Sequence, residues 1–383
     1  MTPKRKVGRI LIVAGSDSGG GAGIQADIKT VTMLGGHAMT AITAITAQNT
    51  LGVQTVHPVP TDMVVAQMRS CIDDIGVDAV KIGMIGSAAT AHAVADVLEG
   101  LDVPIVFDPV MVATSGSVLA DADTIAAFGR LIALATVIAP NLPELAALGG
   151  EDAVRATGAA LLVKGGHGVG ELIEDRLIAA DGVETRWSSP RIDTPHTHGT
   201  GCTLASAIAE GLGRGLALRA AIDRARLFVR MALHEAPGLG GGHGPMGHQE
   251  VRLDCNLGGA TLNQITLPAT DHAASFAFYR ALGLMPIVDS EGRYARFESA
   301  GGTTLSIETA EEIGGRPVVF LECGDLDRAV LAARAAGITV DDPVDQSWGW
   351  REARLFDPAG NALCLYTAGE NRRFPPWRLR CPD

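Results

Sequence analysis

The sequence predicts two domains: a doubly wound, mostly parallel α/β sheet with helices on both faces, followed by a smaller α+β domain. Short apolar runs alternate with longer amphipathic stretches over the first part of the chain, which is typical of βα units. After about residue 261 the pattern changes and then repeats itself once. The length of 383 residues also exceeds that of an average single domain.

The expected strands of the first domain are short and apolar on both faces, as in a sheet that helices cover. They lie at residues 10–14, 79–82, 105–107, 137–139 and 161–164, and the expected helices lie at 25–34, 61–75, 88–98, 122–134 and 203–214. A glycine-dense stretch at 237–248 closes this pattern. We therefore place the first domain at residues 1–250 and a linker at 251–260.

The second domain, at residues 261–369, carries an internal repeat. Its expected elements are a strand at 262–267, a helix at 271–282 and strands at 285–289, 294–298 and 304–308. Three residues recur 54 positions later, namely Asp271, Arg280 and Gly283 as Asp325, Arg334 and Gly337. This agreement in register predicts two copies of a β-α-β-β-β unit. Residues 370–383 are rich in proline and arginine, and we expect them to form a tail.

Composition and charge argue against several kinds of partner. A net charge of −12 disfavours a nucleic acid, and no apolar run is long enough to span a bilayer. The first apolar run is short and follows charged residues, so it is expected to be a strand and not a signal peptide. The six cysteines form no CxxC pair, which favours reduced thiols. We expect a cytoplasmic protein without nucleic-acid or membrane partners.

Polar and glycine-rich segments directly follow the predicted strands. They lie at residues 15–17, 81–84, 108–111, 141–144 and 164–167. Ligands of doubly wound sheets bind beyond the carboxyl ends of the strands, so these segments are expected to form one composite site.

A further segment, His198-Gly199-Thr200-Gly201-Cys202, opens directly onto the last predicted helix of the first domain. The N–H groups at a helix start lack partners within the helix and, together with the helix dipole, bind anions. A thiol at this place indicates chemistry on a phosphate. The alternative is a glycine-rich helix start with a small buried residue.

In their order along the chain, the motifs of the first domain resemble those of the hydroxymethylpyrimidine and hydroxymethylpyrimidine-phosphate kinases of thiamin biosynthesis, which are ribokinase-like. The motifs are Gly19 to Asp27, Thr46 to Thr50, Lys81 to Met84, Asp108 to Met111, Asn141 to Glu144, Lys164 to His167 and His198 to Cys202. The resemblance implies a homodimer that uses ATP and Mg²⁺ to phosphorylate 4-amino-5-hydroxymethyl-2-methylpyrimidine and its monophosphate. The chain departs from most relatives in a shorter segment between Glu144 and Lys164, which puts the adenine contacts in question.

The resemblance also implies roles for single residues. The pyrimidine is expected at Gly15, Asp27, Gln48, Met84 and Val110, the ATP phosphates at Asn141, Lys164 and Thr200, and Mg²⁺ at Asp108 and Glu144. Lys164 and the backbone of Gly199 and Gly201 would stabilise the transferring phosphoryl group. Cys202 would take the proton from the substrate hydroxyl, and we expect the helix start to lower the pKa of its thiol by about a unit or more.

Each of these assignments has a structural alternative. Gln48 can be a loop amide that bonds to the backbone, and Met84 and Val110 can be core residues. The two acids can cap helices, and the lysine can end a strand in solvent. Two other functions also stay open for this domain: a pyridoxal kinase, and a pyrimidine sensor that transfers nothing.

Residues 261–369 resemble the vicinal-oxygen-chelate superfamily, which includes glyoxalases and bleomycin-resistance proteins. The resemblance rests on the repeat and on the segment 357–361, which is similar to the last hairpin of that fold. The four metal positions of the superfamily fall on Gln264, Ser306, Val318 and Cys364. Gln264 alone is a usual ligand type. Glu308 lies on the same strand face as Ser306 and is considered as its substitute. We expect a metal-free ligand-binding cup or a dimerisation module, not a metal-dependent isomerase. Four aromatic residues could line the cup or belong to the core, namely Tyr294, Trp348, Trp350 and Tyr366.

Overall fold

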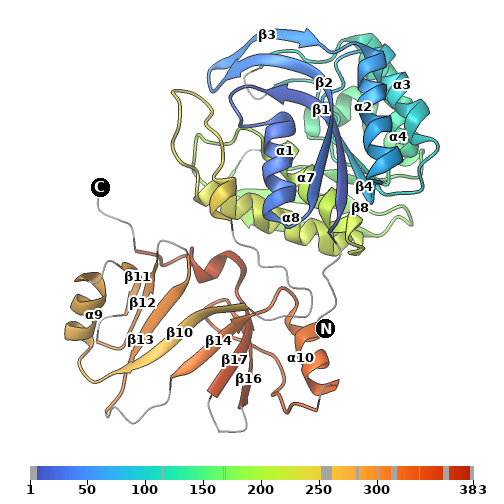
Figure 1. Cartoon of the computed structure of the whole chain (residues 1–383). Coiled ribbons are helices and arrows are strands. Elements are labelled where there is room, and N and C mark those ends of the chain that lie inside the picture. Colours follow the sequence, from blue (N-terminus) through green and yellow to red (C-terminus); the bar gives the residue numbers. More distant parts are fainter. Residues whose placement is uncertain are drawn as a thin grey trace. The chain divides into compact units, whose positions relative to one another are not determined.

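The computed structural model describes residues 7–113, 116–166, 168, 170–251, 261–281, 284–290, 292–299, 302–311, 317–335, 337–356 and 362–379. The chain divides into two compact units, residues 1–251 and 252–383 (Figure 1). Most of the expected linker, the expected hairpin at 357–361 and Gly283 of the repeat lie outside the described residues. No helix of the described part combines the length and the apolar character that crossing a membrane needs.

The first unit contains a nine-stranded sheet in the order β3-β2-β1-β4-β5-β6-β7-β8-β9. The strands are β1 (Arg9–Asp17), β2 (His37–Asn49), β3 (Gly52–Pro58), β4 (Ala79–Ile82), β5 (Ile105–Phe107), β6 (Val137–Ile138), β7 (Ala160–Val163), β8 (Leu172–Ile178) and β9 (Glu184–Pro190). Strands β2, β1, β4, β5, β6 and β7 run parallel, whereas β3, β8 and β9 are antiparallel to their neighbours. The predicted mostly parallel sheet is confirmed.

Helices cover both faces of this sheet (Figure 1). One group consists of α2 (Thr61–Asp74), α3 (Ala88–Leu98) and α4 (Ala122–Leu134), and the other of α1 (Gly23–Met33), α7 (Thr200–Gly213) and α8 (Leu218–His234). Two short helices, α5 (Leu142–Ala147) and α6 (Gly150–Arg155), form the connection that the sequence showed to be short, and the 3₁₀ turn η1 (His248–Glu250) follows near the end of the unit.

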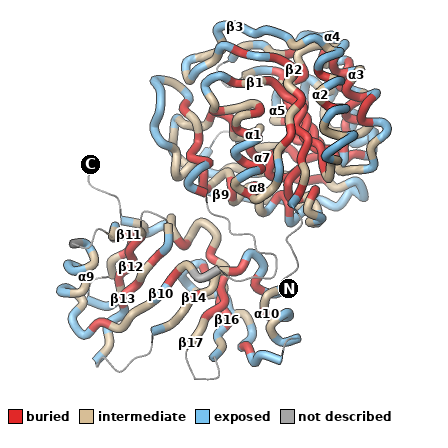
Figure 2. The backbone as a smooth tube through the Cα atoms, viewed as in Figure 1, coloured by how far each residue is buried: buried red, intermediate tan, exposed pale blue. Residues whose placement is uncertain are grey.

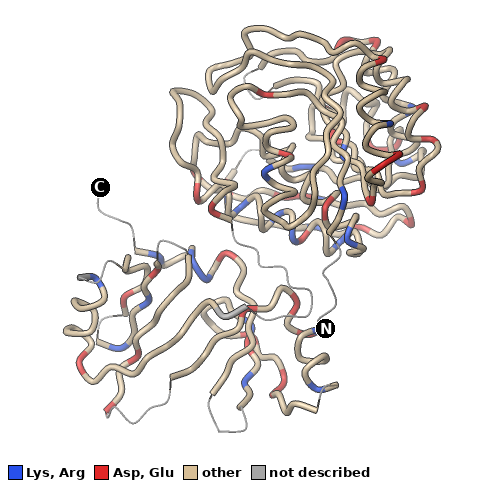
Figure 3. The backbone as a smooth tube through the Cα atoms, viewed as in Figure 1, with Lys and Arg blue, Asp and Glu red and all other residues tan. Residues whose placement is uncertain are grey.

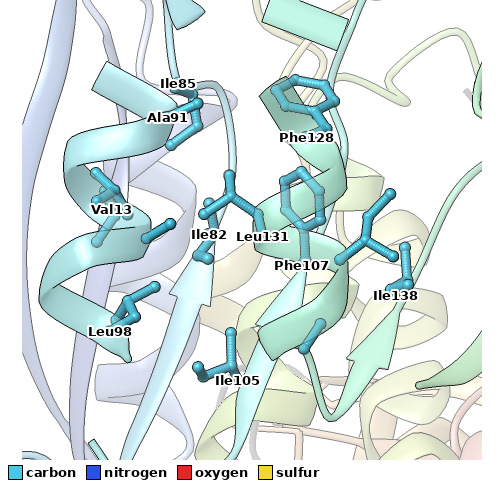
Figure 4. Packing of buried hydrophobic residues seen from close by; sticks show 14 of the residues in the cluster. Val13, Ile82, Ile85, Ala91, Leu98, Ile105, Phe107, Phe128, Leu131 and Ile138 are labelled. Atoms are coloured by element: carbon cyan, nitrogen blue, oxygen red, sulfur yellow. The ribbon is translucent and has the colours of Figure 1, made fainter. Parts of the chain in front are cut away.

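The central strands form a rigid base for their carboxyl ends. Every residue of β4, β5 and β7 is buried (Figure 2). Phe107 of β5 meets Phe128 of α4 edge to face, with ring centroids 5.2 Å apart, within an aliphatic cluster (Figure 4). Because such interiors are close-packed, side chains at the strand ends are held in fixed positions.

The sequence did not reveal the outer strands β2, β3, β8 and β9. They alternate between buried and solvated positions or are mostly exposed, so they lack the continuous apolar run that marked the central strands. The β2–β3 hairpin leaves Ile45 52%, Leu51 71% and Val56 40% exposed.

The second unit contains an eight-stranded sheet in the order β11-β12-β13-β10-β14-β17-β16-β15. Its first repeat is β10 (Thr261–Ala269), α9 (His272–Ala281), β11 (Met285–Ser290), β12 (Tyr294–Glu298) and β13 (Thr304–Thr309). Its second repeat is β14 (Val318–Glu322), α10 (Leu326–Ala335), β15 (Val344–Asp345), β16 (Arg351–Phe356) and β17 (Ala362–Thr367). The predicted pair of β-α-β-β-β units is confirmed.

The expected tail is not free where the structure describes it. The chain continues after β17 as the turn η2 (Gly369–Arg372), and Arg373 and Arg378 both pair with Glu298 of β12. The backbone N–H of Leu379 donates to the carbonyl of Ile287 in β11. Glu298 is only 4% exposed, so its buried charge needs these cations and holds the segment on the sheet. Figure 3 marks the charged positions along the chain.

Candidate active site

A cavity of about 1040 Å³ lies at the carboxyl ends of the strands of the first unit. Its lining includes twelve of the thirteen residues predicted for the site: Gly15, Gln48, Met84, Asp108, Val110, Asn141, Glu144, Lys164, Gly199, Thr200, Gly201 and Cys202. The composite site expected from the strand ends is therefore one continuous space.

Lys164 lies between two carboxylates in this cavity. Its Nζ is 2.5 Å from Oδ1 of Asp108 and 3.8 Å from Oε2 of Glu144. The lysine side chain is only 14% exposed, which excludes the alternative of a solvated strand end. Burial alone would lower the pKa of Lys164, but the two carboxylates outweigh it and raise that pKa, so the lysine stays charged.

Glu144 caps the helix on which it lies. Its carboxylate accepts a hydrogen bond from the backbone N–H of Asn141 at 2.8 Å, and the Asn141 side chain accepts one from the N–H of Glu144, also at 2.8 Å. This reciprocal capping box starts α5. The pKa of Glu144 is raised overall, because burial and the nearby Asp108 carboxylate outweigh Lys164, which lowers it. Glu144 therefore caps a helix, which was the structural alternative for both acids, whereas the carboxylate of Asp108 pairs with Lys164.

The start of α7 brings its backbone to the same place. Gly199, with φ +85°, precedes the helix, and a Cβ there would lie 1.9 Å from the carbonyl oxygen of Gly21. A Cβ on Gly201 would lie 3.3 Å from Nζ of Lys164 and 3.5 Å from Oδ2 of Asp108. Glycine thus allows the first turn to approach the charged pair closely, where the helix itself supplies no acceptor for its N–H groups.

The lowered pKa that we expected for Cys202 is wrong for this arrangement. Burial raises the pKa of the thiol to about 11, and the Asp27 and Asp108 carboxylates act in the same direction. Lys81 lowers this pKa but is outweighed. The helix start is outweighed by desolvation and by these two carboxylates. The thiol is therefore protonated at neutral pH in this arrangement.

Asp27 is the predicted site residue that does not line the cavity. It is fully buried, and its carboxylate binds Nζ of Lys81 at 2.8 Å and accepts from the Ser206 hydroxyl at 2.7 Å. Its place on α1 next to β4 and α7 makes it an internal counter-ion, so the predicted contact with the pyrimidine is corrected. Lys81, which we did not predict as a site residue, lines the cavity instead.

The lining of the cavity also combines apolar side chains with the Gln48 amide. A Cβ on Gly15 would lie 3.1 Å from Met84 Sδ, so the glycine leaves room for the methionine side chain. The Gln48 side chain lies 3.1 Å from Nε2 of His198 and accepts from the Thr46 hydroxyl at 3.2 Å. These side-chain partners do not support the alternative of an amide that satisfies the backbone.

Sequence reasoning missed several cavity residues. Asp17 accepts hydrogen bonds from the N–H groups of Gly19, Gly21 and Ala22, and Nε2 of His198 lies 3.1 Å from its carboxylate. An aspartate inside a glycine-rich loop was the available signal. Arg191 donates to the carbonyls of Gly166, Gly168 and Gly170 and so supports the loop after Lys164, but its distance in the sequence left no signal.

Acid should destabilise the first unit through His248, which supports α7. This imidazole is fully buried, and its Nε2 lies 2.8 Å from the Thr203 hydroxyl. Burial, assisted by Lys29, lowers its pKa from 6.5 to about 4. Between these pH values the unfolded chain binds a proton that the folded chain does not, so stability present above pH 6.5 is lost as the pH falls to 4, by about 3 kcal/mol.

Urea unfolding at pH 7 and pH 4 measures this loss. His248→Gln should lack that share of the pH dependence, whereas His92→Gln, at an exposed position of α3, should retain it. Equal losses in both variants would contradict the assignment.

Comparison with known proteins gives the following similarities. Residues 17–247 match the phosphomethylpyrimidine kinase family, and residues 261–365 match the glyoxalase/bleomycin resistance protein/dioxygenase superfamily. The hydroxymethylpyrimidine/phosphomethylpyrimidine kinase of Streptomyces coelicolor is 47% identical over 254 residues, which cover 62% of this chain and 93% of that protein. The two resemblances drawn from the motifs are confirmed.

Two solved structures share the fold of the first unit. Bacillus subtilis pyridoxal kinase, solved as an ADP complex, has a TM-score of 0.60 and 35% identity over 65% of this chain and 100% of its own. The phosphomethylpyrimidine kinase of Clostridium difficile has a TM-score of 0.50 and 33% identity over 59% of this chain and 98% of its own.

Proposed function

Because the chain belongs to the phosphomethylpyrimidine kinase family, we propose that its first unit phosphorylates 4-amino-5-hydroxymethyl-2-methylpyrimidine and its monophosphate with ATP. The observation that carries the proposal is the meeting of Lys164, Asp108 and the start of α7 at one end of a cavity that Gln48 and Met84 also line. Phosphoryl transfer needs this combination, because the protein mainly positions the reactants and neutralises charge.

The pyrimidine is placed against the wall formed by Gln48, Met84 and Val110. The Gln48 amide offers both a donor and an acceptor, which matches the amino group and ring nitrogen of an aminopyrimidine edge. Met84 and Val110 contact the ring faces. This pose directs the hydroxymethyl group toward Cys202, which lines the same cavity.

Lys164 and the helix start bind the group in transfer. The ammonium of Lys164 attracts the γ-phosphate, and the N–H groups of Gly201 and Cys202 receive the charge that develops on its oxygens. The backbone N–H of Thr200 donates to the carbonyl of Thr197 at 3.4 Å, a long hydrogen bond that a phosphate oxygen can replace. Asn141 has its side-chain oxygen in the capping box, so its amide N–H₂ is the part directed to phosphate.

Asp108 and Glu144 fit a magnesium ion that arrives with the nucleotide. Both are almost fully buried, and Mg²⁺ is usually held by one or two carboxylates together with phosphate oxygens and water. When bound, the ion would neutralise charge on the phosphates. The carboxylates themselves hold Lys164 in place.

Cys202 is proposed as the base for the alcohol substrate. Its sulfur takes the hydroxyl proton as the oxygen bonds to the γ-phosphorus and ADP leaves. The raised pKa of the thiol means that few molecules hold the thiolate at neutral pH, so the rate on the alcohol should rise with pH. The monophosphate needs no such base, because its second pKa near 6 leaves the attacking oxygen ionised.

One assay tests the activity and the base together. ADP release is measured with the hydroxymethylpyrimidine, its monophosphate and pyridoxal side by side, and kcat/KM should be at least about tenfold higher for both pyrimidines than for pyridoxal. Cys202→Ala should lose about a hundredfold in kcat on the alcohol, but less than about tenfold on the monophosphate. Cys202→Asp, which restores a carboxylate base, should recover part of the alcohol activity.

The outcomes separate the candidates. Preference for pyridoxal would favour the second candidate, which the likeness to Bacillus subtilis pyridoxal kinase supports. Binding without turnover would identify a sensor. Equal losses of Cys202→Ala on alcohol and monophosphate would reject the sulfur as a base but not the kinase.

The second unit is proposed to be a ligand-binding module and not a metal-dependent isomerase. Of the four positions carried over from the superfamily, Val318 is a hydrocarbon, the Ser306 hydroxyl bonds to Tyr294, and burial raises the pKa of the Cys364 thiol to about 12. Gln264 bonds to Thr304 at 2.8 Å. This set of side chains does not fit a metal.

Homodimerisation stays a prediction, for which the exposed β2–β3 hairpin of the first unit offers an apolar surface.

A further inference from the structure

One face of the sheet of the second unit packs on its two helices, and the other carries most of the buried polar side chains beside an aromatic cluster. Side chains alternate between the faces of a strand. On β12 and β13, Ala295, Phe297 and Ile307 pack with α9, which places Arg296 and Ser306 on the opposite face. On β16 and β17 the same alternation turns Ala353 and Leu365 toward α10. We call the side away from both helices the polar face: Gln264, Tyr294, Arg296, Thr304, Ser306, Glu352 and Tyr366.

The polar face is buried, and nearly every polar group on it has a partner. Ser306 is 0%, Glu352 3% and Arg296 5% exposed. The Ser306 and Tyr294 hydroxyls lie 2.8 Å apart, and Glu352 pairs with Arg354 at 2.9 Å. Burying such groups is costly unless they are paired, so a buried charge on this face that has no opposite charge beside it requires an explanation.

Arg296 is that charge. Its Nε donates to the Tyr294 hydroxyl at 3.0 Å and its Nη1 to the carbonyl of Arg372 at 2.9 Å. Its Cζ lies 4.5 Å from the ring centroid of Trp350, which holds the guanidinium flat. Both hydrogen-bond partners are neutral. Within the part of the chain that the structure describes, no carboxylate pairs with Arg296, and its Nη2 donates no hydrogen bond.

The other charges near this face do not supply the missing anion. Glu298, at the end of β12, is shared by Arg373 and Arg378. Glu322 pairs with Arg372 at 3.2 Å, and Glu352 with Arg354. Each of these three carboxylates already has at least one arginine. Glu308, on the same face, is exposed and forms no pair with Arg296 among the described residues, so the buried positive charge of Arg296 is left in excess.

We propose that the polar face binds a small organic anion, whose carboxylate or phosphate oxygens take the open N–H groups of Arg296. A guanidinium presents a fork that matches both groups, and here it is fixed before the ligand arrives. The hydroxyls of Tyr294 and Ser306 lie beside it; one bonds to the other, so a single hydroxyl proton is left as a further donor. Trp350 stacks on Tyr366 with centroids 4.6 Å apart, which fixes the ring on which the guanidinium lies. The inference rests on the proposal that the second unit is a ligand-binding module, and it does not depend on the proposed kinase activity.

Calorimetric titration of the full chain with three probes tests the proposal. Benzoate carries a carboxylate, phenyl phosphate a phosphate, and benzyl alcohol neither. We expect at least one anion to bind, benzyl alcohol not to bind, and Arg296→Gln to weaken the anion at least tenfold. Tighter binding of benzoate indicates that the natural ligand carries a carboxylate, and tighter binding of phenyl phosphate indicates that it carries a phosphate. Failure of both anions to bind at millimolar concentration, or equal binding by Arg296→Gln, would overturn the proposal.

A matched variant separates binding from folding. Arg328→Gln removes an exposed arginine of α10 and should leave anion binding unchanged. The anion should also raise the unfolding temperature of the wild type and of Arg328→Gln, but not of Arg296→Gln. If Arg296→Gln fails to fold, Ser306→Ala keeps the guanidinium and removes one neighbouring donor, so it should weaken the anion severalfold; unchanged binding by Ser306→Ala in that case would also count against the site.

Discussion

Replacement of Lys164 by methionine should lower kcat for the hydroxymethylpyrimidine about a thousandfold, with a KM for the pyrimidine that changes only severalfold. The ammonium of Lys164 lies 3.3 Å from the position of a Cβ on Gly201, in the first turn of α7. Methionine keeps the length of the chain but removes the charge that the migrating phosphoryl group needs. The pyrimidine wall is untouched, so binding of the acceptor should survive.

A steady-state assay with matched variants makes this result specific. Arg219→Met removes an exposed cation of α8 and should keep full turnover. Lys164→Arg retains charge but not the fit between Asp108 and Glu144, so it should recover only part of the loss. A Lys164→Met enzyme that keeps a tenth of the wild-type kcat would show that the lysine holds the two carboxylates and does not act on phosphate.

The architecture and most of the site could be predicted because they depend on local patterns. Buried parallel strands are continuous apolar runs, and the residues that follow them meet at one edge of the sheet. This was enough to bring Asp108, Lys164 and Cys202 to one cavity. The pairing of Lys164 with both acids could not be predicted, since the rotation of each side chain depends on packing.

Asp27 shows a misreading that the helix pattern could have prevented. It lies three residues after Ile24 and four before Val31, and all three are buried on the same face of α1. An aspartate on such an apolar stripe indicates an internal partner more than a ligand contact. That the partner is Lys81 could not be read from the sequence, because β4 and α1 are brought together only by the fold.

The pKa of Cys202 and the C-terminal segment illustrate a different limit. The helix start at Cys202 is visible in the sequence, but burial and the surrounding carboxylates that reverse its effect are tertiary. Likewise, the composition of residues 370–379 is typical of a solvated tail. The buried Glu298 that holds this segment is far away in the sequence.

Replacement of Lys81 by methionine should lower the free energy of unfolding by about 3–5 kcal/mol. Both Lys81 and Asp27 are fully buried, with Nζ and Oδ2 2.8 Å apart. Burial would lower the pKa of Lys81, but Asp27, Cys202 and Asp108 reverse this and raise it, so the pair is ionic. Without the ammonium, the carboxylate of Asp27 is left in the interior with the Ser206 hydroxyl as its remaining side-chain partner among the described residues.

A double-mutant cycle by urea unfolding distinguishes loss of the pair from loss of packing. Asp27→Asn alone should also be destabilising, but the Lys81→Met/Asp27→Asn protein should be more stable than the sum of the single losses predicts, because no unpaired charge stays buried. Lys29→Met, at an exposed position of the same helix as Asp27, should cost under about 1 kcal/mol. Strict additivity of the two buried substitutions would mean that Lys81 is stabilised by contacts other than Asp27.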